Sequence, residues 1–279
     1  MFLQLPRRRL DLDAPVVMGV LNVTPDSFSD GGRHVRPEAA LARARQMVAE
    51  GARIIDIGGE STRPGAAPVG EGEELDRVLP VIEAIVRELD VVVSVDTMKP
   101  VVMREACRAG AEIINDVNGL RSDSALATAA DSGAAICLMH MQGEPRTMQQ
   151  QPGYADVVTE VATFLRARMS VCEGAGIAPE RLLIDPGFGF GKALEHNLDL
   201  LGRLDALLDL GRPLLVGLSR KSMFGQLLGV PVDERLHGSL AAAVLAAWQG
   251  ARIIRAHDVR ATVEALAVAT AVKARRERS

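Results

Sequence analysis

Gly51-Ala-Arg-Ile-Ile-Asp56 recurs as Gly110-Ala-Glu-Ile-Ile-Asn115 and as Gly250-Ala-Arg-Ile-Ile-Arg255, and a looser copy begins at Gly133. Each copy follows an alanine-rich amphipathic segment. Glycine ends a helix by adopting the left-handed conformation, and the short β-branched run after it has the character of a buried strand. The polar residue that closes the phrase falls where the strand meets its loop. The phrase therefore predicts a repeated helix–strand–loop unit.

Eight strands are predicted in this way, at Val16–Leu21, Ile54–Ile57, Val91–Val95, Ile113–Ile114, Ala135–Met139, Leu182–Ile184, Leu214–Gly217 and Arg252–Ile254. Helical patterns alternate with them, at Pro37–Glu50, Glu73–Leu89, Pro100–Ala109, Ser124–Asp131, Tyr154–Gly174, Leu194–Leu208, Asp233–Gln249 and Asp258–Arg275. Strict alternation indicates an α/β protein with a parallel sheet, and eight repeats favour closure into a (β/α)8 TIM barrel. A doubly wound open sheet is the alternative. Because no linker or low-complexity stretch interrupts the pattern, residues 1–279 are expected to form a single domain.

Composition narrows the class of protein. Hydrophobic residues make up 48% of the chain but aromatic residues only 3%, so the core must be aliphatic, as in parallel sheets covered by helices. The net charge of −4 does not suggest a generally basic, nucleic-acid-binding surface. No stretch reaches the ~18 apolar residues of a membrane-spanning helix, and the N-terminus lacks the order of a signal peptide. A cytoplasmic protein is expected.

Two smaller features are predicted to be structural. The basic run from Arg7 to Arg9 is interpreted as a solvated chain end. The three cysteines, Cys107, Cys137 and Cys172, form no C-x-x-C pair and are odd in number. They are therefore expected to be buried, inert thiols in a reducing compartment rather than a disulfide framework.

Two predicted loops are extended beyond the usual length of about 2–6 residues after a strand. The first βα loop runs from residue 22 to about 36 and the second from 58 to about 72, and both are rich in Gly, Pro, Ser, Thr and Asp. Long polar loops at the carboxyl ends of barrel strands lie on the catalytic face. Both loops are predicted to act as lids.

Polar residues follow nearly every predicted strand, where a barrel places its chemistry. They are Asn22, Asp56, Asp96, Asn115, Asp116, His140, Asp185, the run Ser219-Arg-Lys-Ser222, and Arg255 with His257. One such residue alone is usually a cap or turn former. Acidic and amide groups follow the third, fourth and sixth strands, whereas cationic groups follow the last two. This asymmetry predicts a ligand with hydrogen-bond donors at one end and negative charge at the other.

Two segments resemble phosphate-binding elements. Ser219-Arg-Lys-Ser222 follows the seventh strand, where barrels often bind phosphate; the alternative is a solvated basic turn. Asp185-Pro-Gly-Phe-Gly-Phe-Gly-Lys192 fails the Walker A pattern, because Pro186 stands where the first glycine is required and Ala193 where Ser or Thr is required. Its glycines are instead predicted to form a tight loop that presents Asp185 and Phe190.

The pattern does not favour a zinc site, because the five histidines show no H-E-x-x-H spacing and the cysteines do not cluster. A hard cation with oxygen ligands fits better. Mg²⁺ keeps several waters and often shares substrate phosphates, so a single protein oxygen such as that of Asn22 could suffice.

The motifs resemble those of the dihydropteroate synthases. Leu21-Asn-Val-Thr-Pro-Asp-Ser-Phe-Ser-Asp-Gly-Gly32 and Asp56-Ile-Gly-Gly-Glu-Ser-Thr-Arg-Pro-Gly65 look like the two signatures of that family. Ser94-Val-Asp-Thr97, Ile114-Asn-Asp116, Leu138-Met-His-Met141, Asp185–Lys192, Ser219–Ser222 and Arg255–Asp258 complete the pattern in order. The resemblance spans about residues 15 to 270 and is greatest to the bacterial, single-function form.

The resemblance implies a role for each matching position. Pterin binding is implied for Asp96, Asn115, Met139, Asp185 and Lys221, and a Mg²⁺ ligand for Asn22. Pyrophosphate binding is implied for Thr62, Arg255 and His257. The p-aminobenzoate site is implied for Phe28, Arg63, Pro64, Phe190 and Ser222, and catalytic roles for Asp30, Arg63 and Lys221.

The implied reaction joins 6-hydroxymethyl-7,8-dihydropterin pyrophosphate to p-aminobenzoate, by a route that we expect to be SN1-like. Sulfonamides, which resemble p-aminobenzoate, are implied as inhibitors, and a homodimer through the last helices is implied as the assembly.

The rival functions are a pterin-dependent methyltransferase, a Schiff-base aldolase using Lys221, and a non-catalytic pterin-binding barrel. The first would need a cobalamin domain, and the second a lysine without charge.

Overall fold

The computed structural model describes residues 1–24, 35–61, 67–144 and 147–276. Eight parallel strands form one sheet in the order β8-β7-β6-β5-β4-β3-β10-β9. Their bounds are β3 (Val16–Asn22), β4 (Ile54–Gly58), β5 (Val92–Asp96), β6 (Ile113–Asp116), β7 (Ala135–Met139), β8 (Leu182–Asp185), β9 (Leu215–Val216) and β10 (Ile253–Ala256).

A single parallel bridge between Ile184 and Leu214 joins β8 to β9 and closes the sheet into a barrel. The Ile184 N–H donates to the carbonyl of Pro213 at 3.0 Å. The predicted (β/α)8 barrel is therefore confirmed, and the alternative of an open sheet is wrong. The predicted extended loops fall partly outside the described ranges, at residues 25–34 and 62–66.

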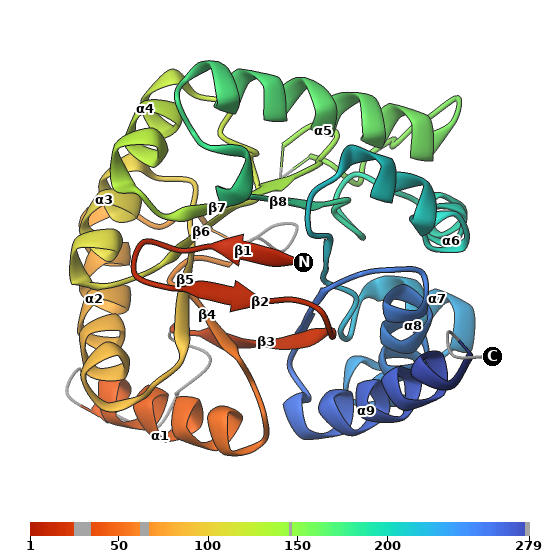
Figure 1. Cartoon of the computed structure of the whole chain (residues 1–279), viewed down its shortest axis with the longest axis horizontal. Helices are drawn as coiled ribbons and strands as arrows, with labels where there is room; N and C mark the ends of the chain where they lie inside the picture. Colours follow the sequence, from red (N-terminus) through yellow and green to blue (C-terminus); the bar gives the residue numbers. More distant parts are fainter. Residues whose placement is uncertain (25–34, 62–66, 145–146, 277–279) are drawn as a thin grey trace.

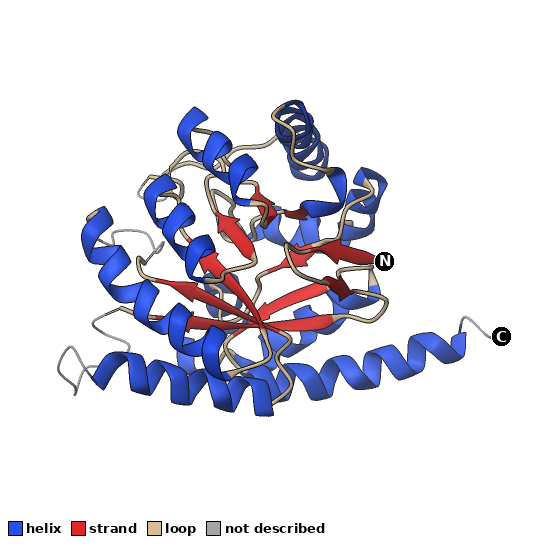
Figure 2. Cartoon of the chain, turned by 60° about the vertical axis from the view of Figure 1, so that its left-hand side comes forward, coloured by secondary structure: helices blue, strands red, loops and turns tan. Residues whose placement is uncertain are grey.

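Helices surround the strands (Figures 1 and 2). They are α1 (Val35–Ala49), α2 (Glu71–Glu88), α3 (Pro100–Ala109), α4 (Asp123–Ser132), α5 (Val157–Gly174), α6 (Leu194–Gly202), α7 (Ser222–Leu228), α8 (Leu236–Trp248) and α9 (Val259–Arg276). The predicted helix Leu194–Leu208 is divided into α6 and the 3₁₀ helix η3 (Leu204–Leu210). The predicted helix Asp233–Gln249 is shortened to α8, which the 3₁₀ helix η4 (Val232–Glu234) precedes. Sequence reasoning did not predict α7. None of the described helices combines the length and apolar character that crossing a membrane requires.

The repeated glycine phrase behaves as predicted. Gly51, Gly110 and Gly250 all adopt positive φ, at 105°, 113° and 107°, directly before a buried strand. Each is also packed tightly, because a Cβ at Gly110 would lie 2.9 Å from Val86 Cγ1 and one at Gly250 would lie 2.7 Å from Leu208 Cδ1. Both the backbone angle and the close approach require glycine here.

The N-terminal end of the barrel is plugged by a hairpin that sequence reasoning missed. Strands β1 (Phe2–Gln4) and β2 (Arg9–Asp11) pair antiparallel and lie across the barrel strands (Figure 1). Leu3, Leu5, Leu10 and Leu12 are at most 4% exposed and pack against residues at the starts of the barrel strands.

The interpretation of Arg7 to Arg9 as a solvated end is therefore wrong for Arg8. Its guanidinium donates to Glu112 Oε2 at 2.7 Å and to Asp90 Oδ1 at 2.8 Å, which fastens the hairpin turn to the barrel. The basic triplet masked the alternation of buried leucines on either side of it, which is the signal of the hairpin.

The cysteines match their prediction in part. All three are free thiols. Cys137 and Cys172 are buried, whereas Cys107 is half-buried, and burial raises the pKa of the Cys107 thiol to about 11. A raised pKa disfavours the thiolate and with it reactivity.

Candidate active site

The strand register brings the predicted pterin residues to one rim of the barrel. Asn22 is level with Gly58, Gly58 with Asp96, and Asp96 with Asn115 on successive strands. Met139 at the end of β7 is level with Asp185 at the end of β8. The residues lie at the carboxyl ends of their strands, where barrels carry their chemistry.

Arg255 at the end of β10 bridges two carboxylates of this rim. Its Nε donates to Asp56 Oδ2 at 2.6 Å, and its Nη2 donates to Asp96 Oδ2 at 2.8 Å. Asn115 Nδ2 also donates to Asp56 Oδ2, at 3.1 Å. Asp56 is fully buried, and its Oδ1 has no hydrogen-bond partner in the described part of the chain. One guanidinium and one amide thus hold a cluster with an excess of negative charge.

The acidic and basic groups of the rim are poorly solvated. Burial raises the pKa of Asp96 to about 7, although Arg255 opposes the shift. Burial likewise raises the pKa of Asp185, whose Oδ1 accepts the Gly187 N–H at 2.7 Å. Burial lowers the pKa of Lys221 to about 8, assisted by the charge of Arg255. Strongly shifted groups that converge on one rim are typical of functional sites.

An apolar wall stands beside these charges. Met139 packs with Val117, Met141 and Met148, and Phe190 lies against this cluster. The Lys221 ammonium lies 4.2 Å from the centroid of the Phe190 ring, which is a cation–π contact. The rim therefore offers an apolar surface for a flat ring and carboxylate and amide groups for its polar edge.

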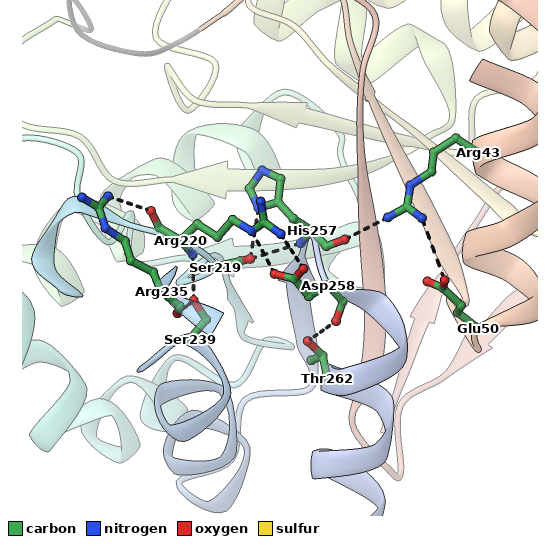
Figure 3. Close-up of polar contacts among 9 residues, drawn as sticks. All are labelled: Arg43, Glu50, Ser219, Arg220, Arg235, Ser239, His257, Asp258 and Thr262. Carbon is green, nitrogen blue, oxygen red and sulfur yellow. Dashed lines mark hydrogen bonds and ion pairs between the residues drawn. The ribbon is translucent and has the colours of Figure 1, made fainter. Parts of the chain in front are cut away.

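The loop after β9 and the loop after β10 are tied together (Figure 3). Ser219 Oγ accepts the His257 backbone N–H at 3.1 Å and lies 3.0 Å from His257 Nδ1. Lys221 is the N-cap of α7 and Ser222 its first residue. Ser219 and His257 are thus in contact, whereas Arg255 is bound to Asp56 and Asp96 and the Lys221 ammonium lies over Phe190. An anion site at these residues and Ser222 stays a prediction.

Comparison with known proteins identifies the family. Residues 18–257 match the family described as pterin binding enzyme. The chain is 58% identical over 268 residues to the dihydropteroate synthase of Escherichia coli (strain K12), which covers 96% of this chain and 95% of that protein. The chain belongs to the dihydropteroate synthase family.

Two solved structures of dihydropteroate synthases share the fold. The Yersinia pestis enzyme, in complex with a sulfonamide drug, is 54% identical with a TM-score of 0.94, and the match covers 98% of this chain and 100% of that one. The Xanthomonas albilineans enzyme in complex with 7,8-dihydropteroate is 50% identical with a TM-score of 0.90, covering 98% and 99%.

Arg220 differs from its neighbours in the family's Ser-Arg-Lys-Ser motif. It has φ of 57°, a left-handed conformation that is rare for arginine. Its guanidinium donates to both carboxylate oxygens of Asp258, at 2.9 and 2.6 Å. Its backbone N–H donates to Ser239 Oγ at 2.9 Å, and its carbonyl accepts from Arg235 Nη1 at 3.2 Å. Arg220 therefore binds within the fold and ties the two cationic loops together (Figure 3).

Lys99 performs a similar task for the second long loop, and sequence reasoning assigned it no role. Its ammonium pairs with Glu60 Oε2 at 2.5 Å and with the buried Glu74. Glu60 Oε1 also accepts the Val69 N–H at 3.0 Å, so one carboxylate joins both ends of this loop. A basic residue in the Asp96–Pro100 segment is the signal that could have indicated this role.

Asp56 is a further site residue without a predicted role. The sequence marks it as a strand-end residue, but its partner Arg255 is 199 positions away, so the pairing could not be read from the chain. The predicted roles of Phe28, Asp30, Thr62, Arg63 and Pro64 concern residues that lie outside the described ranges.

Asn22, the predicted magnesium ligand, lies beside an open space at the end of β3. A Cβ at Gly58 would lie 3.7 Å from Asn22 Oδ1 and 3.6 Å from Asp96 Cβ, so the glycine keeps the space between them open. Within the described ranges, no three His, Cys, Asp or Glu side chains are placed to hold a metal together. A magnesium ion held through Asn22 would have to take its other ligands from water and phosphate, and this role of Asn22 stays a prediction.

Proposed function

We propose that the chain condenses 6-hydroxymethyl-7,8-dihydropterin pyrophosphate with p-aminobenzoate to give 7,8-dihydropteroate and pyrophosphate in folate biosynthesis. The observation that carries this proposal is the convergence of Asp96, Asn115 and Asp185 with Lys221 and Arg255 on one rim. The relative crystallised with 7,8-dihydropteroate supports it, because that product contains both substrate halves.

The pterin would be held by its aminopyrimidine edge. That edge presents several N–H donors, and the Asp96 and Asp185 carboxylates with the Asn115 amide oxygen are acceptors for them. Lys221 would donate to the carbonyl and N5 side, and Met139 would lie beside the ring. Donors from the pterin would favour the ionised form of Asp96, whose pKa burial otherwise raises to about 7.

The pyrophosphate would lie at the cationic side of the rim, against Thr62, Arg255 and His257. Asn22 would hold Mg²⁺, which when bound adds positive charge to the departing pyrophosphate. Arg255 is shared with Asp56 and Asp96, so it is oriented before the anion arrives. Preorganised positive charge of this kind stabilises the charge that develops on a leaving group.

The reaction would occur at the methylene carbon attached to the pterin. The C–O bond to pyrophosphate breaks with its electron pair, the arylamine nitrogen forms the new C–N bond, and the amine loses a proton. We propose an SN1-like order in which C–O cleavage leads, with Asp30 and Arg63 from the long loops beside the reacting centre. If these loops exclude water, the carbocation that C–O cleavage leaves at the methylene carbon would react with the amine and not with water.

The p-aminobenzoate would bind between Phe28, Arg63, Pro64, Phe190 and Ser222. Sulfonamides carry the same arylamine and would compete there. The relative crystallised with a sulfonamide drug supports this part of the proposal.

We also propose a cytoplasmic homodimer. Leu245 on α8 and Val268 and Val272 on α9 are 53%, 66% and 54% exposed, and α9 extends beyond the barrel (Figure 2). Association of these helices would cover that apolar surface. Sedimentation equilibrium tests the assembly: Val268→Glu should give monomers, and an unchanged dimer or a wild-type monomer would refute this interface.

Pyrophosphate release tests the function. The assay follows release from the pterin pyrophosphate with Mg²⁺, with and without p-aminobenzoate, and measures dihydropteroate by chromatography. Release that depends on the amine and matches product formation supports the proposal. Pterin binding without turnover would instead favour a non-catalytic pterin-binding barrel, and absence of binding would refute both.

A further inference from the structure

The glycine-rich segment after β8 ends in a lysine that serves its own loop. Lys192 is 3% exposed. Its ammonium donates to the carbonyl of Gly187 at 2.9 Å and to that of Phe190 at 3.1 Å, and it lies 2.9 Å from His140 Nδ1. In a phosphate-binding loop the corresponding lysine reaches the ligand. Here the same residue type is bound to two carbonyls of the segment that precedes it.

The protonation states suit this arrangement. Burial lowers the pKa of His140 to about 3, and the charge of Lys192 adds to the shift. The imidazole is therefore neutral near pH 7, and its Nδ1 can accept a hydrogen bond from the lysine. Burial lowers the pKa of Lys192 to about 7, while Asp185 opposes this shift. Either form of the amine retains hydrogens to donate to the two carbonyls.

Other contacts leave this loop little freedom. Tyr154 Oη donates to the Gly191 carbonyl at 2.7 Å, and the Gly189 N–H donates to Asn197 Oδ1 at 2.7 Å. A Cβ at Gly187 would lie 1.9 Å from the His140 carbonyl oxygen. The loop is therefore pressed against the end of β7, and Lys192 joins the two from within.

The part of the loop that Lys192 holds carries Phe190. The lysine binds the main-chain carbonyl of Phe190, and the Phe190 ring faces the Lys221 ammonium at 4.2 Å. By contrast, Asp96 and Asn115 lie on β5 and β6, and Asp185 is the last residue of β8. The Asp185 carboxylate accepts the Gly187 N–H of this loop at 2.7 Å, so a shift of the loop would reach one of the three pterin acceptors. It would move the Phe190 wall more, because Phe190 lies in the loop itself whereas Asp96 and Asn115 lie on other strands.

We propose that Lys192, through its bonds to the Gly187 and Phe190 carbonyls and to His140, is a positioning residue that sets the aromatic wall of the p-aminobenzoate site. The inference rests on the proposed function, because Phe190 is assigned to that site there. According to this proposal, the buried Lys192–His140 pair affects the binding of p-aminobenzoate more than that of the pterin pyrophosphate.

The test is a comparison of substrate parameters in Lys192→Met, which keeps the length of the side chain but removes its donors. We expect the KM for p-aminobenzoate to rise by about tenfold, less than the roughly 10²-fold that a 1 Å misplacement of a positioned group can cost. The Kd for the pterin pyrophosphate, measured by calorimetry without p-aminobenzoate, should change clearly less than the KM, because Asp96 and Asn115 lie on β5 and β6 outside the loop. Equal changes in both values, or none in either, would overturn the proposal.

The matched control is Arg181→Met. Arg181, like Lys192, donates to two main-chain carbonyls, those of Ala134 and Ala129, but it precedes β8 at the opposite end of the barrel. The Arg181→Met variant should have a lower melting temperature, but its KM for p-aminobenzoate should not rise selectively over its Kd for the pterin pyrophosphate. The same separation in Arg181→Met would show that general loosening of the fold suffices, and would refute a positioning role.

A second pair of variants applies if Lys192→Met does not fold. His140→Asn places an amide oxygen near the position of Nδ1, whereas His140→Leu removes the acceptor. We expect His140→Leu to raise the p-aminobenzoate KM and His140→Asn to restore it toward the wild-type value; the reverse order would contradict the inference. A wild-type protein without amine-dependent turnover would instead refute the proposed function itself.

Discussion

The two ends of the barrel are built from opposite kinds of side chain. At the N-terminal end, Leu3, Leu5, Leu10 and Leu12 fill the opening with aliphatic surface. At the carboxyl end, carboxylates, a lysine and an arginine crowd together with shifted pKa values. The closed end stabilises the fold, whereas the charged end holds groups that are costly to bury.

The difference between the two ends indicates that the groups able to gain free energy from a ligand lie at the charged rim. The charged rim contains an unpartnered buried oxygen, Asp56 Oδ1, and carboxylates whose ionisation burial disfavours. A ligand with N–H donors would favour the ionised forms of Asp96 and Asp185, whereas Asp56, which is 0% exposed, presents no surface to a ligand. Active sites commonly carry such groups at the expense of stability, so variants at the two ends should affect different properties.

The largest expected effect is on catalysis, in Lys221→Met. Removing the ammonium should lower kcat/KM by about 10³-fold, as for loss of a preorganised donor. The free energy of unfolding should stay equal or rise, because burial lowers the pKa of Lys221 to about 8 and thus disfavours its charged form in the fold. Steady-state kinetics with urea unfolding measures both. A loss below tenfold, or a clearly destabilised variant, would remove Lys221 from the functional end.

The converse is expected for Leu12→Ala. Leu12 is completely buried in the hairpin plug, so the substitution should lower the free energy of unfolding by about 3 kcal/mol through lost burial and a cavity. At 25 °C, kcat/KM should remain within about twofold of wild type, because the plug lies at the end opposite the active site. Leu198→Ala is the control, since Leu198 is 39% exposed. A large catalytic loss in Leu12→Ala would show that the two ends are coupled.

The sequence predicts features that depend on local chemistry. The glycines before the strands, the alternation of strand and helix, and the polar strand ends are set by backbone angles and burial over a few residues. For this reason the strand pattern alone is enough to place Asp96, Asn115 and Asp185 on one rim.

The direction of a side chain could not be predicted in the same way. Arg220 and Lys221 are neighbours of similar charge, yet Arg220 turns to Asp258, 38 positions away, whereas Lys221 faces Phe190. The backbone differs as well, with φ of 57° at Arg220 and −61° at Lys221, and nothing in the two residue types indicates that difference. Lys192 likewise stands in the sequence where a phosphate-binding lysine would stand, but its ammonium binds the Gly187 and Phe190 carbonyls of its own loop.

A third effect concerns the dependence of stability on pH, in Asp96→Asn. Burial raises the pKa of Asp96 to about 7, so from about pH 4 to 7 the folded protein keeps a proton that the unfolded chain has released. Raising the pH through this window therefore destabilises the wild type relative to Asp96→Asn by up to about 4 kcal/mol, since each of the roughly three pKa units corresponds to about 1.4 kcal/mol. Urea unfolding from pH 4 to 8 measures the difference, with the exposed Asp233→Asn as control. A difference that is constant with pH would contradict the raised pKa.

The smallest effect is expected where the charged end is held together, at Arg220 and Asp258. The pair is partly exposed, with side chains 38% and 23% accessible, so its free energy should be modest, about 1 kcal/mol. Arg220→Met and Asp258→Asn should each raise the KM for the pterin pyrophosphate by about fivefold, which corresponds to that energy. The double variant should be no worse than either single one, because each removes the same contact.

Arg220→Gly separates the ion pair from the backbone, since glycine adopts φ of 57° without strain. If the loop depends on the ion pair, Arg220→Gly should be as impaired as Arg220→Met. If the left-handed conformation matters more, glycine should retain the wild-type KM although the ion pair is gone. Additive losses in the double variant would show that the two loops are held independently, and the charged end would then be two separate units rather than one.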